Sequence, residues 1–254
     1  MDLNNKVIVI TGAGQGLGRG MAISLAQEGA NVALIDLNQA DLDETVKLCH
    51  AEGPEAKSYI TNVTSEAEVE ATFNKIVADF GEIHGLVNNA GITRDALLIK
   101  ADKKGDIISR MSLDQWQSVI HVNLTGVFLC GREAATKMVE KGTKGLILNI
   151  CSISKAGNMG QSNYSAAKSG AASLTVTWAK ELARYGIRVA GISPGYISTK
   201  MTEAIKPEAM EKLVKMIPLR RMGEIDEIAH SVVYLFENDF FNGRILEMDG
   251  GMRL

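Results

Sequence analysis

The chain has 254 residues, of which 46% are apolar and 22% charged, and its formal net charge is −3. These proportions are typical of a globular protein with a sizeable core, and the small charge and 5% aromatic content argue against binding to nucleic acid or a membrane surface. Three widely spaced cysteines, no signal-peptide pattern and no long apolar run predict a cytoplasmic protein without disulfides or a metal site.

The first predicted element is a short β-branched strand over Lys6–Ile10, which stops at a glycine-rich turn. A helical pattern then runs to Gly29, and a second strand covers Asn31–Asp36. The turn contains Gly12, Gly16 and Gly18. Strand, turn, helix and strand together form a βαβ unit. Glycines at this place let the backbone approach a pyrophosphate at the helix N-terminus, so the turn predicts a dinucleotide site.

Strands and helices continue to alternate to the end of the chain. The pattern predicts further strands over Ala56–Ile60, Leu86–Asn88, Gly145–Ile150, Ile187–Ile192 and Arg244–Met248. It predicts helices over Leu42–Glu52, Ser65–Phe80, Leu113–Glu140, Gln161–Tyr185, Lys206–Met216 and Ile225–Phe236. Such an alternation forms a mostly parallel sheet with helices on both faces. We therefore expect one α/β domain over residues 1–254, a doubly wound parallel sheet of Rossmann type.

Residues 99–110 depart from this alternation. Two short apolar pieces flank a charged tip that includes Gly105, which predicts a small hairpin or flap. The flap is either a solvated excursion, which we favour, or one edge of the substrate cleft.

Asp36 lies at the end of the second predicted strand, about 20 residues after the glycines. A carboxylate there accepts hydrogen bonds from an adenine ribose and repels a 2′-phosphate. The variable position of the turn holds Gln15 rather than a basic residue, and Leu37 and Asn38 follow the aspartate. These residues predict NAD(H) in preference to NADP(H).

Tyr164 and Lys168 stand four residues apart in an alanine-rich, proline-free segment, so they should share one side of a helix. An ammonium at ~4 Å and an effective dielectric of ~20 stabilises a phenolate by about 4 kcal/mol, or roughly three pKa units. The pKa of Tyr164 is then expected near ~7, where an acid–base catalyst works best. Taken alone, such a pair is more often a half-buried ring beside a solvated charge.

These motifs together resemble the short-chain dehydrogenase/reductase family. The turn Thr11-Gly12 to Gly16-Leu17-Gly18 is similar to that family's cofactor fingerprint, and Asn88-Asn89-Ala90-Gly91 to its sheet-stabilising motif. Asn123, Ser152 and Pro194-Gly195 stand where the family has a helix asparagine, a serine and a post-strand turn. The likeness runs from Lys6 to Gly251 and is greatest to the 3-oxoacyl-[acyl-carrier-protein] reductases and close paralogues.

The resemblance implies a hydride-transfer site. Tyr164 would exchange a proton with the substrate oxygen, and Lys168 would lower the tyrosine pKa and hydrogen-bond the nicotinamide ribose. Ser152 would donate to the substrate oxygen, with Ser154 as the alternative. Asn123 would hold a water that relays protons to Lys168, or tie down a helix bend, or do both. Cofactor contacts are expected from Gly12, Gln15, Gly16, Leu17, Gly18, Asp36, Leu37, Asn62, Val63, Asn89, Ala90, Gly91, Tyr164, Lys168, Pro194, Gly195, Ile197 and Thr199.

Two departures from the family pattern bear on these expectations. Reductases of this group commonly carry a basic residue in the glycine turn and bind NADP, whereas Gln15 and Asp36 favour NAD. Asn62-Val63 stands where the family often has Asp-Val beside the adenine.

Cys151, next to Ser152, has no histidine in its own segment to activate it, so we interpret it as a packed strand-end residue.

The implied function is an NAD(H)-dependent reductase of 3-oxoacyl thioesters. The alternative is a dehydrogenase of a sugar, a steroid or another small secondary alcohol. A non-catalytic dinucleotide sensor is a third reading, and the presence of the whole tetrad Asn123, Ser152, Tyr164 and Lys168 argues against it.

The resemblance also implies a substrate lid and partners. Residues 199–217 are expected to form the lid, with an apolar wall of Met201, Ile205, Met210 and Met216. A homotetramer is expected. Acyl carrier protein is a candidate partner. It is acidic and needs a basic patch, for which Lys141, Lys144 and Arg184 are candidates, although we favour their interpretation as scattered surface charges.

Overall fold

The computed structural model describes the whole chain except residues 54, 200–201, 203–206 and 253–254. Seven parallel strands form one sheet in the order β3-β2-β1-β4-β7-β8-β9. The strands are β1 (Val7–Thr11), β2 (Asn31–Asp36), β3 (Ala56–Ile60), β4 (Gly85–Asn88), β7 (Gly145–Ile150), β8 (Ile187–Pro194) and β9 (Ile245–Met248). The strand order reverses between β1 and β4, and ligands of doubly wound sheets bind beyond the carboxyl ends of the strands at such a point.

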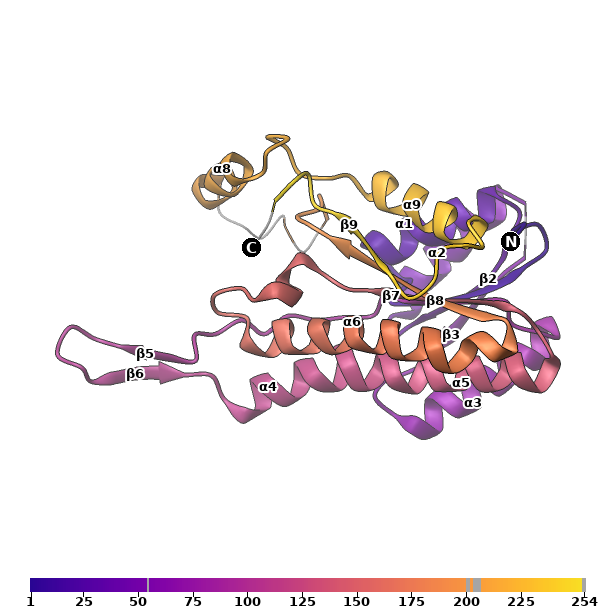
Figure 1. Cartoon of the computed structure of the whole chain (residues 1–254), viewed down its shortest axis with the longest axis horizontal. Helices are drawn as coiled ribbons and strands as arrows, with labels where there is room; N and C mark the ends of the chain where they lie inside the picture. The colour runs from indigo at the N-terminus through magenta and orange to yellow at the C-terminus, as the bar shows by residue number, and fades with distance from the viewer. Residues whose placement is uncertain (54, 200–201, 203–206, 253–254) are drawn as a thin grey trace.

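Helices cover both faces of the sheet (Figure 1). On one face lie α1 (Gly16–Gln27), α2 (Gln39–Ala51) and α9 (Ile225–Glu237). On the other lie α3 (Glu66–Phe80), α4 (Leu113–Ile120), α5 (Gly126–Lys141) and α6 (Ser162–Leu182). A cluster of buried apolar side chains fills each of the two layers. The expected α/β fold of Rossmann type is confirmed.

One predicted helix differs in its course. The sequence pattern favours an unbroken helix over Leu113–Glu140, but a π-helical turn over His121–Thr125 separates α4 from α5. The helix begins at a capping box in which Ser112 accepts from the Gln115 N–H and the Gln115 side chain accepts from the Ser112 N–H. The π turn brings one extra residue, and Asn123 lies within it. Single π turns inside α-helices often occur at functional sites.

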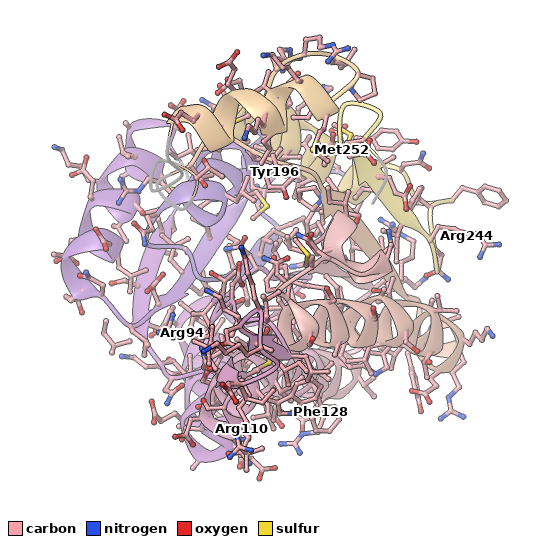
Figure 2. The ribbon with its side chains drawn as sticks, turned by 90° about the vertical axis from the view of Figure 1, so that its left-hand side faces the viewer. Arg94, Arg110, Phe128, Tyr196, Arg244 and Met252 are labelled. Carbon is pink, nitrogen blue, oxygen red and sulfur yellow. The ribbon has the colours of Figure 1, made fainter. Side chains whose placement is uncertain are left out.

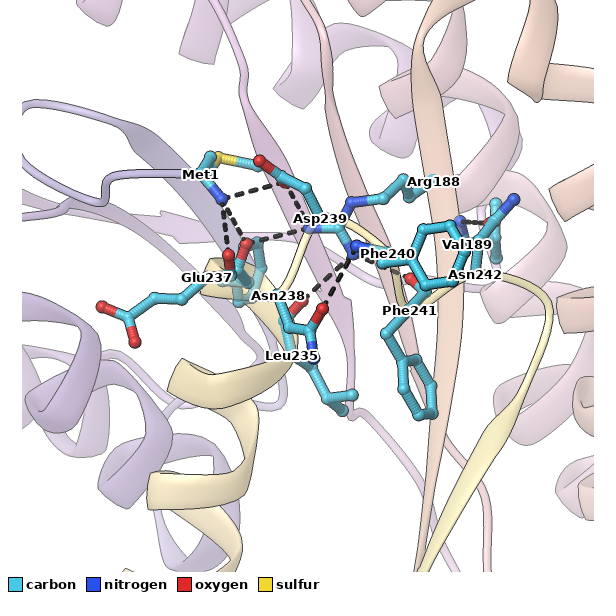
Figure 3. Close-up of polar contacts among 11 residues, drawn as sticks. Met1, Arg188, Val189, Leu235, Glu237, Asn238, Asp239, Phe240, Phe241 and Asn242 are labelled. Atoms are coloured by element: carbon cyan, nitrogen blue, oxygen red, sulfur yellow. Dashed lines mark hydrogen bonds and ion pairs between the residues drawn. The ribbon is translucent and has the colours of Figure 1, made fainter.

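The connection between α9 and β9 is held against the sheet by Arg188 of β8 (Figure 3). Its guanidinium donates to the carbonyls of Leu235, Phe236 and Phe241 at 2.9 to 3.1 Å and pairs with Asp239 at 3.2 Å. Burial lowers the pKa of Arg188, and Asp239 partly offsets this effect. Because one side chain satisfies three carbonyls, this edge of the fold is fixed by a local network.

Residues 99–110 form a hairpin of their own. Strands β5 (Ile99–Ala101) and β6 (Ile107–Arg110) pair antiparallel in a two-stranded sheet separate from the main one. In Figure 1 this hairpin extends beyond the N-terminal end of α4, away from the sheet. Within the described residues, no helix is long and apolar enough to cross a membrane.

Candidate active site

The glycine turn between β1 and α1 has no room for side chains at Gly12 and Gly18. Gly12 and Gly16 have φ angles of +65° and +54°, in the left-handed region that favours glycine. A Cβ on Gly12 would lie 2.9 Å from the Ala90 Cα, and one on Gly18 would collide with the Gly12 carbonyl oxygen. The turn therefore packs backbone to backbone against the end of β4.

The N-terminus of α1 is open in front. Its capping residue, Gln15, is extended and makes no side-chain cap, and a Cβ built on Gly16 would meet nothing within 4 Å. Leu17 and Gly18 follow in the first turn of the helix. Uncapped N–H groups at a helix N-terminus attract anions. The turn therefore fits a dinucleotide pyrophosphate.

Asp36 faces the same turn from the end of β2. Its carboxylate accepts hydrogen bonds from the Gly14 N–H at 2.9 Å and from the Leu37 N–H at 2.7 Å. The nearby guanidinium of Arg19 donates to the carbonyls of Gly14 and Asp41 and to Thr45 Oγ1. The Asp36 carboxylate is thus fixed towards the turn, while the Arg19 guanidinium is hydrogen-bonded to acceptors of the protein itself.

The expected adenine-side residues lie at the ends of β2 and β3. Leu37 is 68% exposed, so its side chain is free to contact a ligand. Asn62 Oδ1 accepts from both the N–H and the hydroxyl of Thr64, and Val63 is buried. A Cβ on Gly126 would lie 2.9 Å from Val63 Cγ2, so Val63 packs closely on α5.

Asn89 joins the end of β4 to the glycine turn. Its amide nitrogen donates to the carbonyls of Thr11 and Gly12, both at 3.0 Å. The hydroxyl of Thr11 accepts from the N–H groups of Asn89 and Ala90, also at 3.0 Å. Gly91 follows and is exposed. This cross-link fixes the separation of β1 and β4, between which the strand order reverses.

Asn123 is fully buried in the π turn and is bonded to the backbone of Ile92. Its Oδ1 accepts from the Ile92 N–H at 2.9 Å, and its Nδ2 donates to the Ile92 carbonyl at 3.0 Å. Of the two roles expected for Asn123, the amide that ties down a helix bend is the one seen in these contacts. The water relay stays a prediction.

Ser152, Tyr164 and Lys168 come together where β7 ends beside the start of α6. The Ser152 side chain lies close enough to the Tyr164 hydroxyl to lower the pKa of the phenol, and its hydroxyl oxygen accepts from the Ser154 N–H at 3.1 Å. The Lys168 ammonium is buried, 5.7 Å from the centre of the Tyr164 ring. The shared helix side of Tyr164 and Lys168 is therefore as expected, and Ser152 rather than Ser154 contacts the tyrosine.

The expected fall in the pKa of Tyr164 is wrong for this structure. Burial raises that pKa to about 12, against a lowering effect of the Ser152 hydrogen bond and a raising effect of Asp95 and Cys151. The lysine ammonium donates to the Ile150 carbonyl at 2.6 Å instead of to the phenol. Burial also lowers the pKa of Lys168. Desolvation thus outweighs the simple charge pairing assumed from the sequence.

The remaining expected contacts lie beyond β8. Gly195 donates its N–H to the Met248 carbonyl at 2.8 Å, directly after Pro194. Ile197 is buried, and the Thr199 N–H donates to Thr202 Oγ1 at 3.0 Å. In Figure 2, which looks onto this end of the molecule, Tyr196 lies in the upper half and Arg94 in the lower half.

The expected lid is described only in part. Helix α8 (Pro207–Met216) covers its second half and contains Met210 and Met216, the latter 63% exposed. The expected start of that helix at Lys206 and the wall residues Met201 and Ile205 lie outside the described residues.

The sequence does not predict a set of hydrogen bonds that joins residues 94–96 to the start of α6, beside Tyr164. Gln161 Nε2 donates to Asp95 Oδ2 at 2.9 Å, Asn163 Nδ2 donates to the Arg94 carbonyl at 3.0 Å, and the Ala96 N–H donates to the Gly160 carbonyl at 2.9 Å. These bonds hold residues 94–96 against the start of α6. Asn163, a polar residue directly before Tyr164, is the sequence feature that could have indicated these contacts, and no role is predicted for it from the sequence.

Cys151, the neighbour of Ser152, has the features of a packed residue. It is buried, and burial raises the pKa of its thiol although Lys168 and Lys155 lower it. A thiol held neutral in this way is a poor nucleophile.

Comparisons with known proteins agree with this geometry. A family model described as "Enoyl-(Acyl carrier protein) reductase" matches residues 12–253. The 3-oxoacyl-[acyl-carrier-protein] reductase FabG of Thermotoga maritima is 41% identical over 99% of both chains. A (3R)-3-hydroxyacyl-CoA dehydrogenase of Canis lupus familiaris is 37% identical over 98% of this chain and 97% of its own. The crystal structure of a putative gluconate dehydrogenase from Agrobacterium tumefaciens is 34% identical, with a TM-score of 0.90 over 99% of this chain and 97% of that one.

Proposed function

The chain belongs to the short-chain dehydrogenase/reductase family, oxidoreductases that act on CH–OH or C=O groups with a nicotinamide cofactor, and from this premise we propose that it is an NAD(H)-dependent reductase of 3-oxoacyl thioesters. The observation that carries the proposal is the convergence of Ser152, Tyr164 and Lys168 at the end of β7 in a chain that aligns along its whole length with 3-oxoacyl reductases. The substrate is then a carbonyl next to a thioester.

Tyr164 is the proposed proton donor. Because its pKa is about 12, the phenol is neutral at pH 7 and holds the proton that a developing alkoxide needs. Ser152, whose side chain lies beside the tyrosine hydroxyl, donates to the same oxygen and stabilises its growing charge. When bound, the nicotinamide supplies the hydride to the carbonyl carbon. In the reverse direction Tyr164 takes the proton back.

Lys168 is the proposed anchor of the nicotinamide ribose. Its ammonium is buried and points from α6 to the end of β7, where it donates to the Ile150 carbonyl at 2.6 Å. Such an ammonium has two further N–H groups to offer to ribose hydroxyls. Asn123 fixes the neighbouring loop through Ile92, and we propose that a water held in this region relays protons to Lys168.

The proposed cofactor is NAD(H). The glycine turn and the first turn of α1 would hold the pyrophosphate, and Asp36 would accept the adenine ribose hydroxyls. What supports NAD over NADP is the carboxylate of Asp36 at the turn, together with the exposed Gln15 where a basic residue would be needed. A 2′-phosphate would be repelled there. Leu37, Asn62 and Val63 would line the adenine side, and Asn89, Ala90, Gly91, Pro194, Gly195, Ile197 and Thr199 the nicotinamide side.

Acyl carrier protein is proposed as the carrier of the substrate, because several relatives are 3-oxoacyl-[acyl-carrier-protein] reductases. A homotetramer is proposed from the family likeness alone. A second candidate function is the oxidation of a sugar acid or another small secondary alcohol, which the similarity to the putative gluconate dehydrogenase favours.

A substrate panel separates the two candidates. The purified protein is given acetoacetyl thioesters with NADH or NADPH, and in parallel gluconate and simple secondary alcohols with NAD, while absorbance of the reduced cofactor is followed. We expect oxidation of NADH with the thioester and loss of that signal in Tyr164→Phe. Turnover only with gluconate or an alcohol would replace the proposed substrate, and silence across the panel despite NADH binding would exclude the reductase.

A further inference from the structure

The hairpin β5–β6 carries an exposed apolar surface that has no part in the proton and hydride transfer proposed above. All seven residues of its two strands are exposed. The exposed aliphatic side chains of the hairpin and of the segment leading into it are Leu97 (42%), Leu98 (70%), Ile99 (59%), Ile107 (59%) and Ile108 (59%). We name these five residues the apolar arm. Leu113 (66%) and Trp116 (38%) continue it onto α4.

The arm is an ordered ribbon. Asp102 donates its N–H to the Asp106 carbonyl at 2.9 Å, and its carboxylate accepts from the N–H groups of Lys104 and Asp106 at 2.8 and 3.0 Å. Isolated two-stranded hairpins are marginal in water and need packing against another element. Ile107 and Ile108 are consecutive in one strand, so their side chains point to opposite faces of the ribbon. Both faces therefore need cover.

We infer that the apolar arm packs against a second copy of this chain. Charge is the first reason. Residues 99–110 contain four basic and two acidic side chains, a net charge of +2, in a chain whose total is −3, so the rest of the chain carries −5. The basic hairpin of one copy is therefore attracted to the net negative remainder of another copy. A two-fold pair would place the arm of each copy on the other.

Area is the second reason. Seven side chains that are about half exposed, with Leu113 and Trp116 included, leave on the order of 400 Å² of apolar surface in water. Patches of roughly 300–600 Å² on a monomer often mark interaction sites. Interfaces normally also contain polar area. With that area added, the apolar arm together with Leu113 and Trp116 would bury roughly 600–700 Å² per copy, close to the ~800 Å² of a stable interface.

The apolar arm needs a partner that stays bound, which favours a second copy over an acidic carrier protein or a bound substrate. A carrier protein binds and leaves with each turnover, which would return both apolar faces of the ribbon to water. The arm also extends away from the sheet beyond the end of α4 (Figure 1). A constant neighbour of the same chain covers the ribbon at all times.

Sedimentation of the full-length protein tests the inference. The double variant Ile107→Lys/Ile108→Lys places two charges on the two apolar faces. Its matched control is Ser109→Lys, which adds a charge to the adjacent exposed position without removing an aliphatic side chain. We expect the concentration at half-association to rise at least about tenfold in the double variant and to change little in the control. An equal effect of the two changes, or none, would overturn the inference.

A fluorescent label keeps the test decisive if other surfaces also hold copies together. The three native cysteines are buried, so a maleimide dye on Ser109→Cys reports on the arm. We expect its emission to shift to the red when the labelled protein is diluted through dissociation, because the arm then meets water. A solvent-like spectrum in the associated protein, a single-copy protein at every concentration, or a shift caused only by added acyl carrier protein would each contradict a second copy as the occupant.

Discussion

Lys168 donates a 2.6 Å hydrogen bond to the main-chain carbonyl of Ile150, the last residue of β7. This bond joins α6 to the strand that leads into Cys151 and Ser152. The ammonium is buried and donates to a neutral carbonyl, so burial lowers the pKa of the lysine. Lys168 therefore sets the position of α6 against β7 as well as supplying charge near Tyr164.

The first prediction concerns this lysine. Lys168→Met keeps the length of the side chain and removes the ammonium, so the ribose anchor and the charge beside Tyr164 are lost. We expect turnover to fall by about 10²–10⁴-fold, the range of a lost acid–base contribution. NADH affinity should weaken in a fluorescence titration. Lys180→Met, on the exposed side of the same helix, is the control and should keep activity. Near-normal turnover of Lys168→Met would remove the lysine from the mechanism.

The second prediction concerns the protonation of Tyr164. Because its pKa is raised to about 12, its phenolate absorbance should appear two units above that of an ordinary tyrosine. The measurement is the alkaline difference spectrum between the cofactor-free wild type and Tyr164→Phe. The unfolded protein binds fewer protons between pH ~10 and ~12, so the tyrosine's contribution to stability is present below pH ~10 and is lost across that window. A phenolate signal near neutral pH would restore the expectation from the sequence.

Much of the fold can be predicted from the sequence, because hydrophobic periodicity and the residues that end helices and strands are local signals. The apolar run Gly145–Ile150, bounded by turn residues, is a central strand, and Ser112 begins α4 with a capping box. The sequence predicts an unbroken helix over Leu113–Glu140, because nothing in its composition indicates the π turn. That turn accompanies two hydrogen bonds between Asn123 and Ile92, which are 31 residues apart.

The parts of the site that failed to follow from sequence depend on tertiary contacts. Helical spacing put Tyr164 and Lys168 on one side of α6, but the sign of the tyrosine pKa shift depends on burial and on a carbonyl of another strand. The contact of Asp95 with Gln161 likewise joins a loop after β4 to the start of α6. A pattern of residue types carries no information about such desolvation.

The third prediction concerns cofactor choice. Asp36→Ala removes the acceptor for the adenine ribose and the charge that would repel a 2′-phosphate. Hydrogen bonds to charged groups contribute about 1.5–3 kcal/mol, so NADH should bind roughly 10–150-fold more weakly while NADPH binding improves. Asp41→Ala, a neighbouring carboxylate in the first turn of α2, should leave the preference unchanged. Dissociation constants for both cofactors measure the ratio. An unaltered ratio in Asp36→Ala would mean that another group selects the cofactor.

The fourth prediction compares Asn123, which lies at the candidate active site, with Asn149, which is buried between strands and contributes to stability alone. Asn123→Ala leaves the N–H and the carbonyl of Ile92 without their partners, which should cost about 2–4 kcal/mol of unfolding free energy. Asn149→Ala is the matched control, since this buried amide accepts from Asn88 at 2.9 Å and donates to Thr175 at 3.0 Å.

Both variants should unfold at lower denaturant concentration, because each leaves buried polar groups unpaired. Only Asn123→Ala should lose most of its turnover under conditions where it is folded, because Ile92 begins the loop whose residues 94–96 lie against the start of α6 beside Tyr164. Chemical denaturation and steady-state assays on the same preparations measure the two effects separately. Equal losses of activity at equal folded fractions would mean that Asn123 contributes stability and nothing specific to the site.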